Sequence, residues 1–104
     1  DIGYKALAVN LSDMAAMGAT PRWFTLALTL PETNQTWLAN FVAGIKILTD
    51  AHQLNLIGGD LSRGPLSITV TILGELPLHQ RLLRSGAKPG DAICVTGNLG
   101  DAAF

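Results

Sequence analysis

The sequence is short of charged residues. They make up 14% of the 104 residues, while 48% are hydrophobic; an average domain has about 25% charged residues. The net charge is −1 and the cations form no basic stripe, so we expect no nucleic-acid partner. A chain this apolar either has a core that is large for its length or covers apolar surface against further protein.

Long hydrophobic runs and cysteines are also scarce. The longest uncharged run, residues 33–45, is shorter than the roughly 18 residues of a membrane span and contains several polar residues, so we expect no membrane association. The single cysteine, Cys94, excludes an internal disulfide and favours a reducing compartment, here the cytoplasm. Because Cys94 stands in an apolar run, we expect a buried and inert thiol.

Apolar periodicity predicts two helices. Residues 2–17 are rich in Ala, Leu and Met, and Gly18 would end this helix. Residues 34–53, capped by Thr33 or Asn34, carry apolar side chains at the spacing of one buried helical face. Shorter patterns predict the remaining elements. These are strands at 22–30, 54–57, 66–72 and 92–96, a helical turn at 78–84, a loop at 85–91 and the start of a helix at 98–104.

This order predicts an α+β fold with two helices on one face of a four-stranded mixed sheet. The strand at 66–72 alternates apolar residues with Ser and Thr, and the strand at 22–30 has one strongly apolar and one mixed face. The helices can cover only one side. We expect the other side, which would expose Trp23 or Phe24, to pair with a second copy into a dimeric barrel. A single sheet with exposed threonines is the alternative.

Asp13 is the first candidate for a functional residue. It stands in a helix that is apolar on every face, which is typical of a buried helix. A buried carboxylate without a cation is costly, and no Lys or Arg lies within one turn of Asp13. A metal ion would supply the missing charge. The alternative is that Asp13 faces water or caps the loop after the helix.

Two further segments predict phosphate chemistry. Gly58-Gly59-Asp60 follows an apolar strand, where paired glycines let backbone N–H groups approach a phosphate and a carboxylate can hold Mg²⁺. An ordinary turn is the alternative. Arg84 in a glycine-containing loop would clamp phosphate oxygens, unless it is simply solvated. If Asp13 and Asp60 share one metal cluster, both should lie at the same end of the sheet. No side chain is predicted to be a covalent catalyst.

Several segments together resemble thiamine-monophosphate kinases. They are residues 4–19 (YKALAVNLSDMAAMGA), 26–31 (LALTLP), 56–60 (LIGGD) with 63–67 (RGPLS), and 84–91 (RSGAKPGD). The resemblance runs in register over nearly the whole chain. The wider superfamily contains the aminoimidazole ribonucleotide and selenophosphate synthetases, which also use ATP and metal ions.

The resemblance implies ATP-dependent phosphorylation of thiamine monophosphate to thiamine diphosphate. It implies that Asp13 and Asp60 bind Mg²⁺, that Gly59, Asp60 and Arg84 contact ATP, and that the protein is a homodimer through this domain. Residues 1–96 would form most of an N-terminal domain that binds ATP and Mg²⁺ but lacks its first strands. Residues 97–104 would begin a C-terminal domain.

The chain departs from the family pattern in two respects. Leu61-Ser62 follows Gly-Gly-Asp where relatives usually carry Thr, which puts a hydroxyl contact in doubt. The family's upstream Gly-Asp-Asp and Ser-Thr-Asp metal motifs and its C-terminal domain are not in this chain, so we expect the chain alone to be inactive. Two alternatives remain: a sister enzyme for aminoimidazole ribonucleotide or selenophosphate synthesis, and a non-catalytic dimerisation domain.

Overall fold

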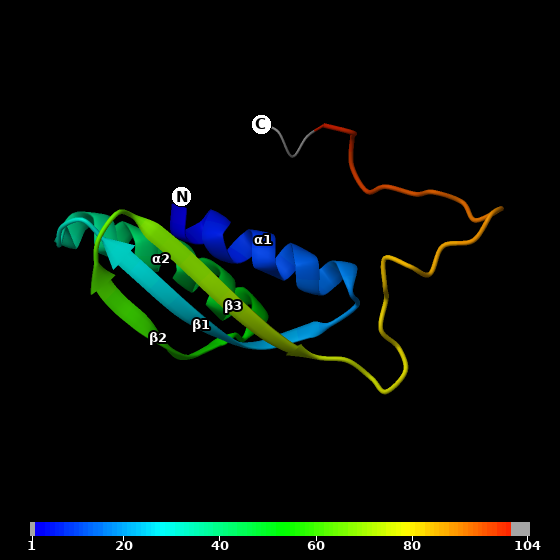
Figure 1. The fold of residues 1–104 in the computed structure, drawn as a ribbon, viewed down its shortest axis with the longest axis horizontal. Coiled ribbons are helices and arrows are strands. Elements are labelled where there is room, and N and C mark those ends of the chain that lie inside the picture. The colour runs from blue at the N-terminus through cyan, green and yellow to red at the C-terminus, as the bar shows by residue number, and fades with distance from the viewer. Residues whose placement is uncertain (1, 101–104) are drawn as a thin grey trace.

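The computed structural model describes residues 2–100 (Figure 1). Along the chain it contains α1 (Ile2–Ala16), β1 (Thr20–Leu30), α2 (Gln35–His52), β2 (Asn55–Arg63) and β3 (Ser67–Glu75). Both predicted helices and the strands predicted at 22–30 and 66–72 are confirmed, with small shifts at their ends. No helix within residues 2–100 is long and apolar enough to cross a membrane.

The three strands form one mixed sheet in the order β2-β1-β3. The central strand β1 pairs in parallel with β2 and antiparallel with β3. Figure 1 shows both helices on one side of this sheet, so the predicted α+β layer with a mixed sheet is confirmed. The predicted number of four strands is wrong for the described residues.

The fourth strand is missing because residues 92–96 pair with no neighbour. After β3 the chain leaves the sheet and runs without helix or strand as far as residue 100 (Figure 1). A short apolar run forms a strand only where another strand satisfies its backbone N–H and C=O groups. Cys94 is consequently exposed, not buried. The helical turn predicted at 78–84 is also absent, and the helix start predicted at 98–104 falls largely outside the described residues.

The core lies between the helices and the apolar face of the sheet. Phe24, only 1% exposed, and Leu7 are its most deeply buried large side chains. The other buried members come from β1, α2 and the residue just before β2: Leu28, Leu30, Phe41, Ile45, Leu48 and Leu54. The sequence offered Thr33 or Asn34 as the N-cap of α2. The cap is Asn34, whose side-chain oxygen accepts a hydrogen bond from the Trp37 N–H at 2.9 Å.

Two glycines set the distance between the helices. A Cβ at Gly3 would overlap the carbonyl oxygen of Phe41, and a Cβ at Gly44 would come within 2.7 Å of the Tyr4 nitrogen. The two backbones therefore touch where α1 crosses α2. This close crossing fixes the position of α1, and with it the position of Asp13 near its other end.

The side of the sheet away from the helices is uncovered. Because side chains of registered partners share a face, the strand pairing places these residues on it. They are Trp23, Thr25, Ala27, Thr29, Asn55, Gly58, Asp60, Ser62, Ser67, Thr69, Thr71 and Leu73. We call this set the open face. The hydroxyl oxygens of Thr29 and Ser62 lie 3.1 Å apart on it. The sequence predicted that Trp23 or Phe24 would be exposed on this side. It is Trp23, at 39% exposed, whereas Phe24 is buried in the core.

Candidate functional site

Asp13 lies near the end of α1 and is exposed. The prediction that this helix is buried is wrong, because α1 contacts α2 and the sheet along one side only; Gly3 and Leu7 are its buried residues. The neighbouring Asn10 is satisfied within the helix, since its side-chain N–H donates to the Ala6 carbonyl at 2.8 Å. Burial therefore does not require a cation at Asp13. Its carboxylate is instead accessible to a ligand.

Asp13 and Arg84 line the same hollow. Its volume is about 570 Å³, and its lining residues are Asp13, Ala16, Met17, Leu82, Leu83 and Arg84. We call it the α1-terminal hollow. The ion pairs within the described part of the chain are Arg22 with Glu75 and Lys46 with Asp50. Asp13 and Arg84 therefore bring opposite charges to one hollow without forming an ion pair with each other.

A contact between distant segments brings these two residues together. The Leu82 N–H donates to the Met17 carbonyl at 3.2 Å, and the Leu82 side chain lies beside Gly18. Gly18 itself has a φ of +72°, which turns the chain out of the helix. Sequence reasoning identified Asp13, Gly18 and Arg84 separately but found no role for Leu82. No local pattern could have found it, because Met17 precedes β1 in the chain and Leu82 follows β3.

Gly59 and Asp60 lie inside a strand. The predicted strand end at Ile57 is wrong, since β2 continues through both glycines to Arg63. At Gly59 φ is +152°, and a Cβ there would overlap the Leu26 carbonyl oxygen. At Gly58 a Cβ would meet nothing closer than Thr25 Cγ2 at 4.0 Å. The pairing of β2 with β1 is thus one reason why Gly59 must be a glycine.

Asp60 belongs to the open face, opposite Ala27 in the register. The helices, and Asp13 with them, cover the other face of the sheet. Asp13 and Asp60 therefore lie on opposite sides of the sheet, and the prediction that they share one metal cluster is wrong within one copy of the chain. Local spacing could not show this, because the face on which Asp60 lies depends on its register with β1. Nowhere in residues 2–100 do three or more His, Cys, Asp or Glu side chains group as metal ligands would.

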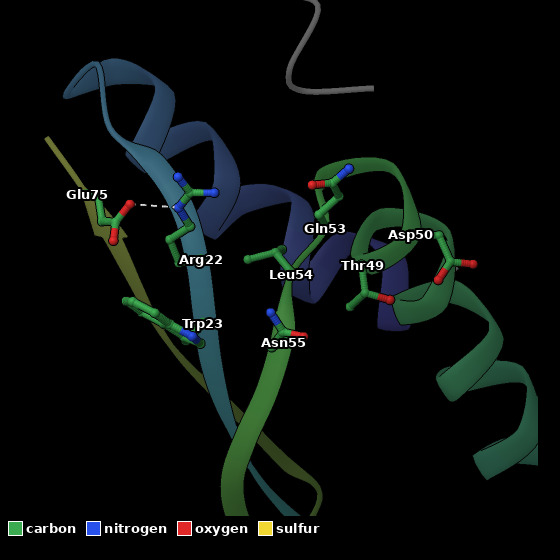
Figure 2. A pocket seen from close by; sticks show the side chains of 8 residues that line it. All are labelled: Arg22, Trp23, Thr49, Asp50, Gln53, Leu54, Asn55 and Glu75. Atoms are coloured by element: carbon green, nitrogen blue, oxygen red, sulfur yellow. Dashed lines mark hydrogen bonds and ion pairs between the residues drawn. The ribbon is translucent and has the colours of Figure 1, made fainter.

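A second hollow, near the start of β1, contains none of the predicted site residues (Figure 2). It lies among the starts of β1 and β2 and the ends of α2 and β3, with a mostly polar lining. Its single cation, Arg22, donates from Nε to Glu75 at 2.8 Å, which neutralises the charge locally. Figure 2 shows this pair at one side of the hollow and Asp50 at the other. We do not assign the ATP site here.

Comparison with known proteins gives the family. The protein-family model described as AIR synthase related protein, N-terminal domain, matches residues 1–76. The chain belongs to this family. The matched region covers both helices and all three strands of the AIR synthase related fold described above. The α1-terminal hollow combines Asp13 from this region with Arg84 from the segment that follows it.

Individual relatives are more specific. The chain is 57% identical over 103 residues to the thiamine-monophosphate kinase of Escherichia coli (strain K12), covering 99% of this chain and 32% of the relative. It is similar to a crystal structure of thiamine-monophosphate kinase from Stenotrophomonas maltophilia K279a, with TM-score 0.93 and 56% identity over 99% of this chain and 33% of that one. A structure of AaThiL complexed with AMPPCP and TMP matches with TM-score 0.67 and 32% identity. The match covers 70% of this chain and 24% of that one.

The resemblance identified from the sequence is therefore confirmed. The chain spans about a third of the length of the thiamine-monophosphate kinases that it matches.

Proposed function

We propose that this chain is the ATP- and Mg²⁺-binding N-terminal domain of a thiamine-monophosphate kinase. Such an enzyme transfers the γ-phosphate of ATP to thiamine monophosphate and produces thiamine diphosphate. The observation that carries the proposal is the 57% identity to a thiamine-monophosphate kinase over 99% of the chain. The structure of AaThiL complexed with AMPPCP and TMP supports a site for ATP and thiamine monophosphate. The chain by itself is proposed to be inactive.

Mg²⁺ fits the residues that the chain supplies. This ion is usually held by one or two carboxylates together with phosphate oxygens, so it needs no dense protein cluster. Asp13 and Asp60 are both exposed carboxylates, and neither is among the ion pairs of the described residues. We propose that each contributes to metal binding from its own face of the sheet. When bound, Mg²⁺ would neutralise charge on the transferring phosphate.

Arg84 is proposed to bind the phosphates of ATP. A guanidinium group offers several N–H donors in a planar arrangement that matches phosphate oxygens. Its position beside Asp13 suits this role, because a metal-bound phosphate needs a cation and a metal ligand on the same hollow. Gly59 and Asp60 are proposed to contact the nucleotide as well. Phosphoryl transfer requires positioning and charge neutralisation, so no residue is assigned as a nucleophile.

We also propose a homodimer in which the open faces of two copies pair into a barrel. Trp23 and Leu73 are registered neighbours on this face and are both about 40% exposed. A second copy would cover them and would bury the Ser and Thr side chains that share the open face. Asp60 would then lie within the interface. Such a contact should bury well above about 1,000 Å².

We also propose a cytoplasmic location for the protein and a domain boundary within this chain. The single cysteine supports a reducing compartment. We propose that residues 1–96 belong to the ATP-binding domain and that residues 97–104 begin the next one.

The test of the function uses the complete protein that carries this chain. Asp13→Asn should abolish transfer of phosphate from ATP to thiamine monophosphate, because a lost metal ligand removes stabilisation of the transition state worth a few kcal/mol or more. Asp50→Asn is the matched control. Asp50 is also an exposed helical aspartate, but it pairs with Lys46 at 2.8 Å away from the α1-terminal hollow. Both variants should unfold at the wild-type temperature.

Three outcomes would contradict the proposal in different ways. Unchanged turnover of Asp13→Asn at saturating Mg²⁺ would exclude the role given to Asp13. ATP consumption with aminoimidazole ribonucleotide synthesis or selenophosphate synthesis, and none with thiamine monophosphate, would identify a sister enzyme. The absence of any ATP-dependent activity in the wild-type protein would favour a dimerisation domain.

A further inference from the structure

We infer that Leu82 is a positioning residue that holds Arg84 at the α1-terminal hollow beside Asp13. This inference rests on the proposed function, because it assumes that Arg84 binds ATP there. Leu82 has an aliphatic side chain and cannot itself bind phosphate or Mg²⁺. The argument depends on how the segment after β3 is attached to the rest of the chain.

The backbone of Leu82 provides that attachment. Its N–H donates to the Met17 carbonyl, a group just beyond α1 for which the helix itself has no donor. The other hydrogen bonds within residues 76–100 join residues of this segment to each other. They run from Gln80 N to Pro77 O, Gly86 N to Leu83 O, Asp91 N to Lys88 O and Lys88 N to the Asp91 carboxylate. In the described chain, Leu82 therefore makes the one hydrogen bond that ties this segment to the folded core.

The side chain of Leu82 supports the same contact. Its Cδ1 would lie 3.6 Å from a Cβ built on Gly18, an ordinary contact distance, so the leucine side chain lies beside the turn that ends α1. Leu82 is 59% exposed and Leu83 is 53% exposed, and both line the hollow. The two leucines differ in one respect: the Leu83 N–H makes no hydrogen bond among the described backbone groups. The Leu83 amide is therefore a close comparison for hydrogen exchange. Leu78, which is 84% exposed and does not line the hollow, is the control for substitution.

Attachment at Leu82 limits where Arg84 can go. Two residues of extended chain span at most about 7 Å, so the Arg84 backbone cannot move far from the end of α1 while the contact holds. Without the contact, a loop with no helix or strand would have to be ordered when ATP binds, and this lowers affinity. Loss of Leu82 should thus weaken ATP binding through Arg84 and leave the chemical step largely unchanged.

Steady-state kinetics of the complete protein test this. Leu82→Ala keeps the backbone N–H but removes the side chain that lies beside Gly18, so the contact should loosen. It should raise the KM for ATP about threefold to tenfold, within the usual range for coupled neighbours, with kcat nearly unchanged. Leu78→Ala, at an 84% exposed leucine of the same segment that does not line the hollow, should have little effect on either constant. The decisive variant is the double one: Arg84→Ala should raise the KM much less in the Leu82→Ala background than in the wild type. A role of Leu82 in general stability would not produce this dependence.

The inference and the proposed function can fail separately. If Arg84→Ala leaves the KM for ATP unchanged, the phosphate contact of Arg84 is refuted, and the role of Leu82 falls with it. If Arg84→Ala raises the KM but Leu82→Ala behaves like Leu78→Ala, or the two effects multiply, only the role of Leu82 is refuted. Amide hydrogen exchange tests the contact without any assay of activity. The Leu82 amide should exchange more slowly than that of Leu83, and equal rates would overturn the inference.

Discussion

Substituting the two neighbouring glycines of β2 separates a structural from a functional role for Gly58-Gly59-Asp60. Gly59→Ala places a Cβ against the Leu26 carbonyl oxygen, and it does so at a φ of +152° that side chains rarely adopt. Gly58→Ala places its Cβ 4.0 Å from Thr25 Cγ2, which is ordinary contact. The two variants make the same chemical change one residue apart. We expect Gly59→Ala to lower stability and Gly58→Ala not to.

The magnitude for Gly59→Ala follows from two terms. The unfavourable backbone conformation costs about 1–3 kcal/mol. The overlap with Leu26 costs about 1–3 kcal/mol more, because β1 is the central strand and cannot move away. Since β2 is an edge strand, it can partly detach, which limits the sum to roughly 2–5 kcal/mol. Gly58→Ala should instead be neutral, or stabilise by up to about 1 kcal/mol, because alanine restricts the unfolded chain.

Urea unfolding followed by tryptophan fluorescence is a suitable assay. Trp23 lies opposite Asn55 of β2 in the register and should therefore report on the β1–β2 pair. A loss of roughly 2–5 kcal/mol is a large share of the 5–15 kcal/mol that holds a typical domain folded, so the midpoint shift should be easily measured. Equal stabilities for the two variants would refute the reasoning. If both glycines served only to approach a phosphate, each substitution would weaken ATP binding without lowering stability.

Other variants test the cap, the core, the phosphate contact and the interface. Asn34→Ala should lower the unfolding free energy by about 1 kcal/mol and Thr33→Ala should not; equal losses would contradict the cap. Leu7→Ala should cost about 2–5 kcal/mol in the same urea assay, and a loss below 1 kcal/mol would contradict its burial. Arg84→Ala should raise the KM for ATP more than the KM for thiamine monophosphate; the reverse would move Arg84 to the acceptor site. Sedimentation at micromolar concentration should show a wild-type dimer and a Trp23→Asp monomer, and a monomeric wild type would refute the barrel.

The sequence by itself determined the helices, the two longest predicted strands and the candidate residues. The apolar spacing in α2 and the strict alternation in β3 are local properties, and they decide which side chains can share a face. The family resemblance rested on motifs that are equally local, and the comparisons confirm it. Asp13 and Arg84 were both identified in this way, but as separate candidates.

The tertiary structure decided what lies next to what. Residues 92–96 have strand composition but no partner strand, and β2 runs through Gly59, where it pairs with Leu26 of β1. Asp13 is exposed although its helix is apolar on every side, since burial depends on the surfaces that pack against a helix and not on its composition. Register placed Asp60 on the open face, and one hydrogen bond from Leu82 to Met17 placed Arg84 beside Asp13. Each of these depends on contacts between residues far apart in the chain, which local periodicity does not encode.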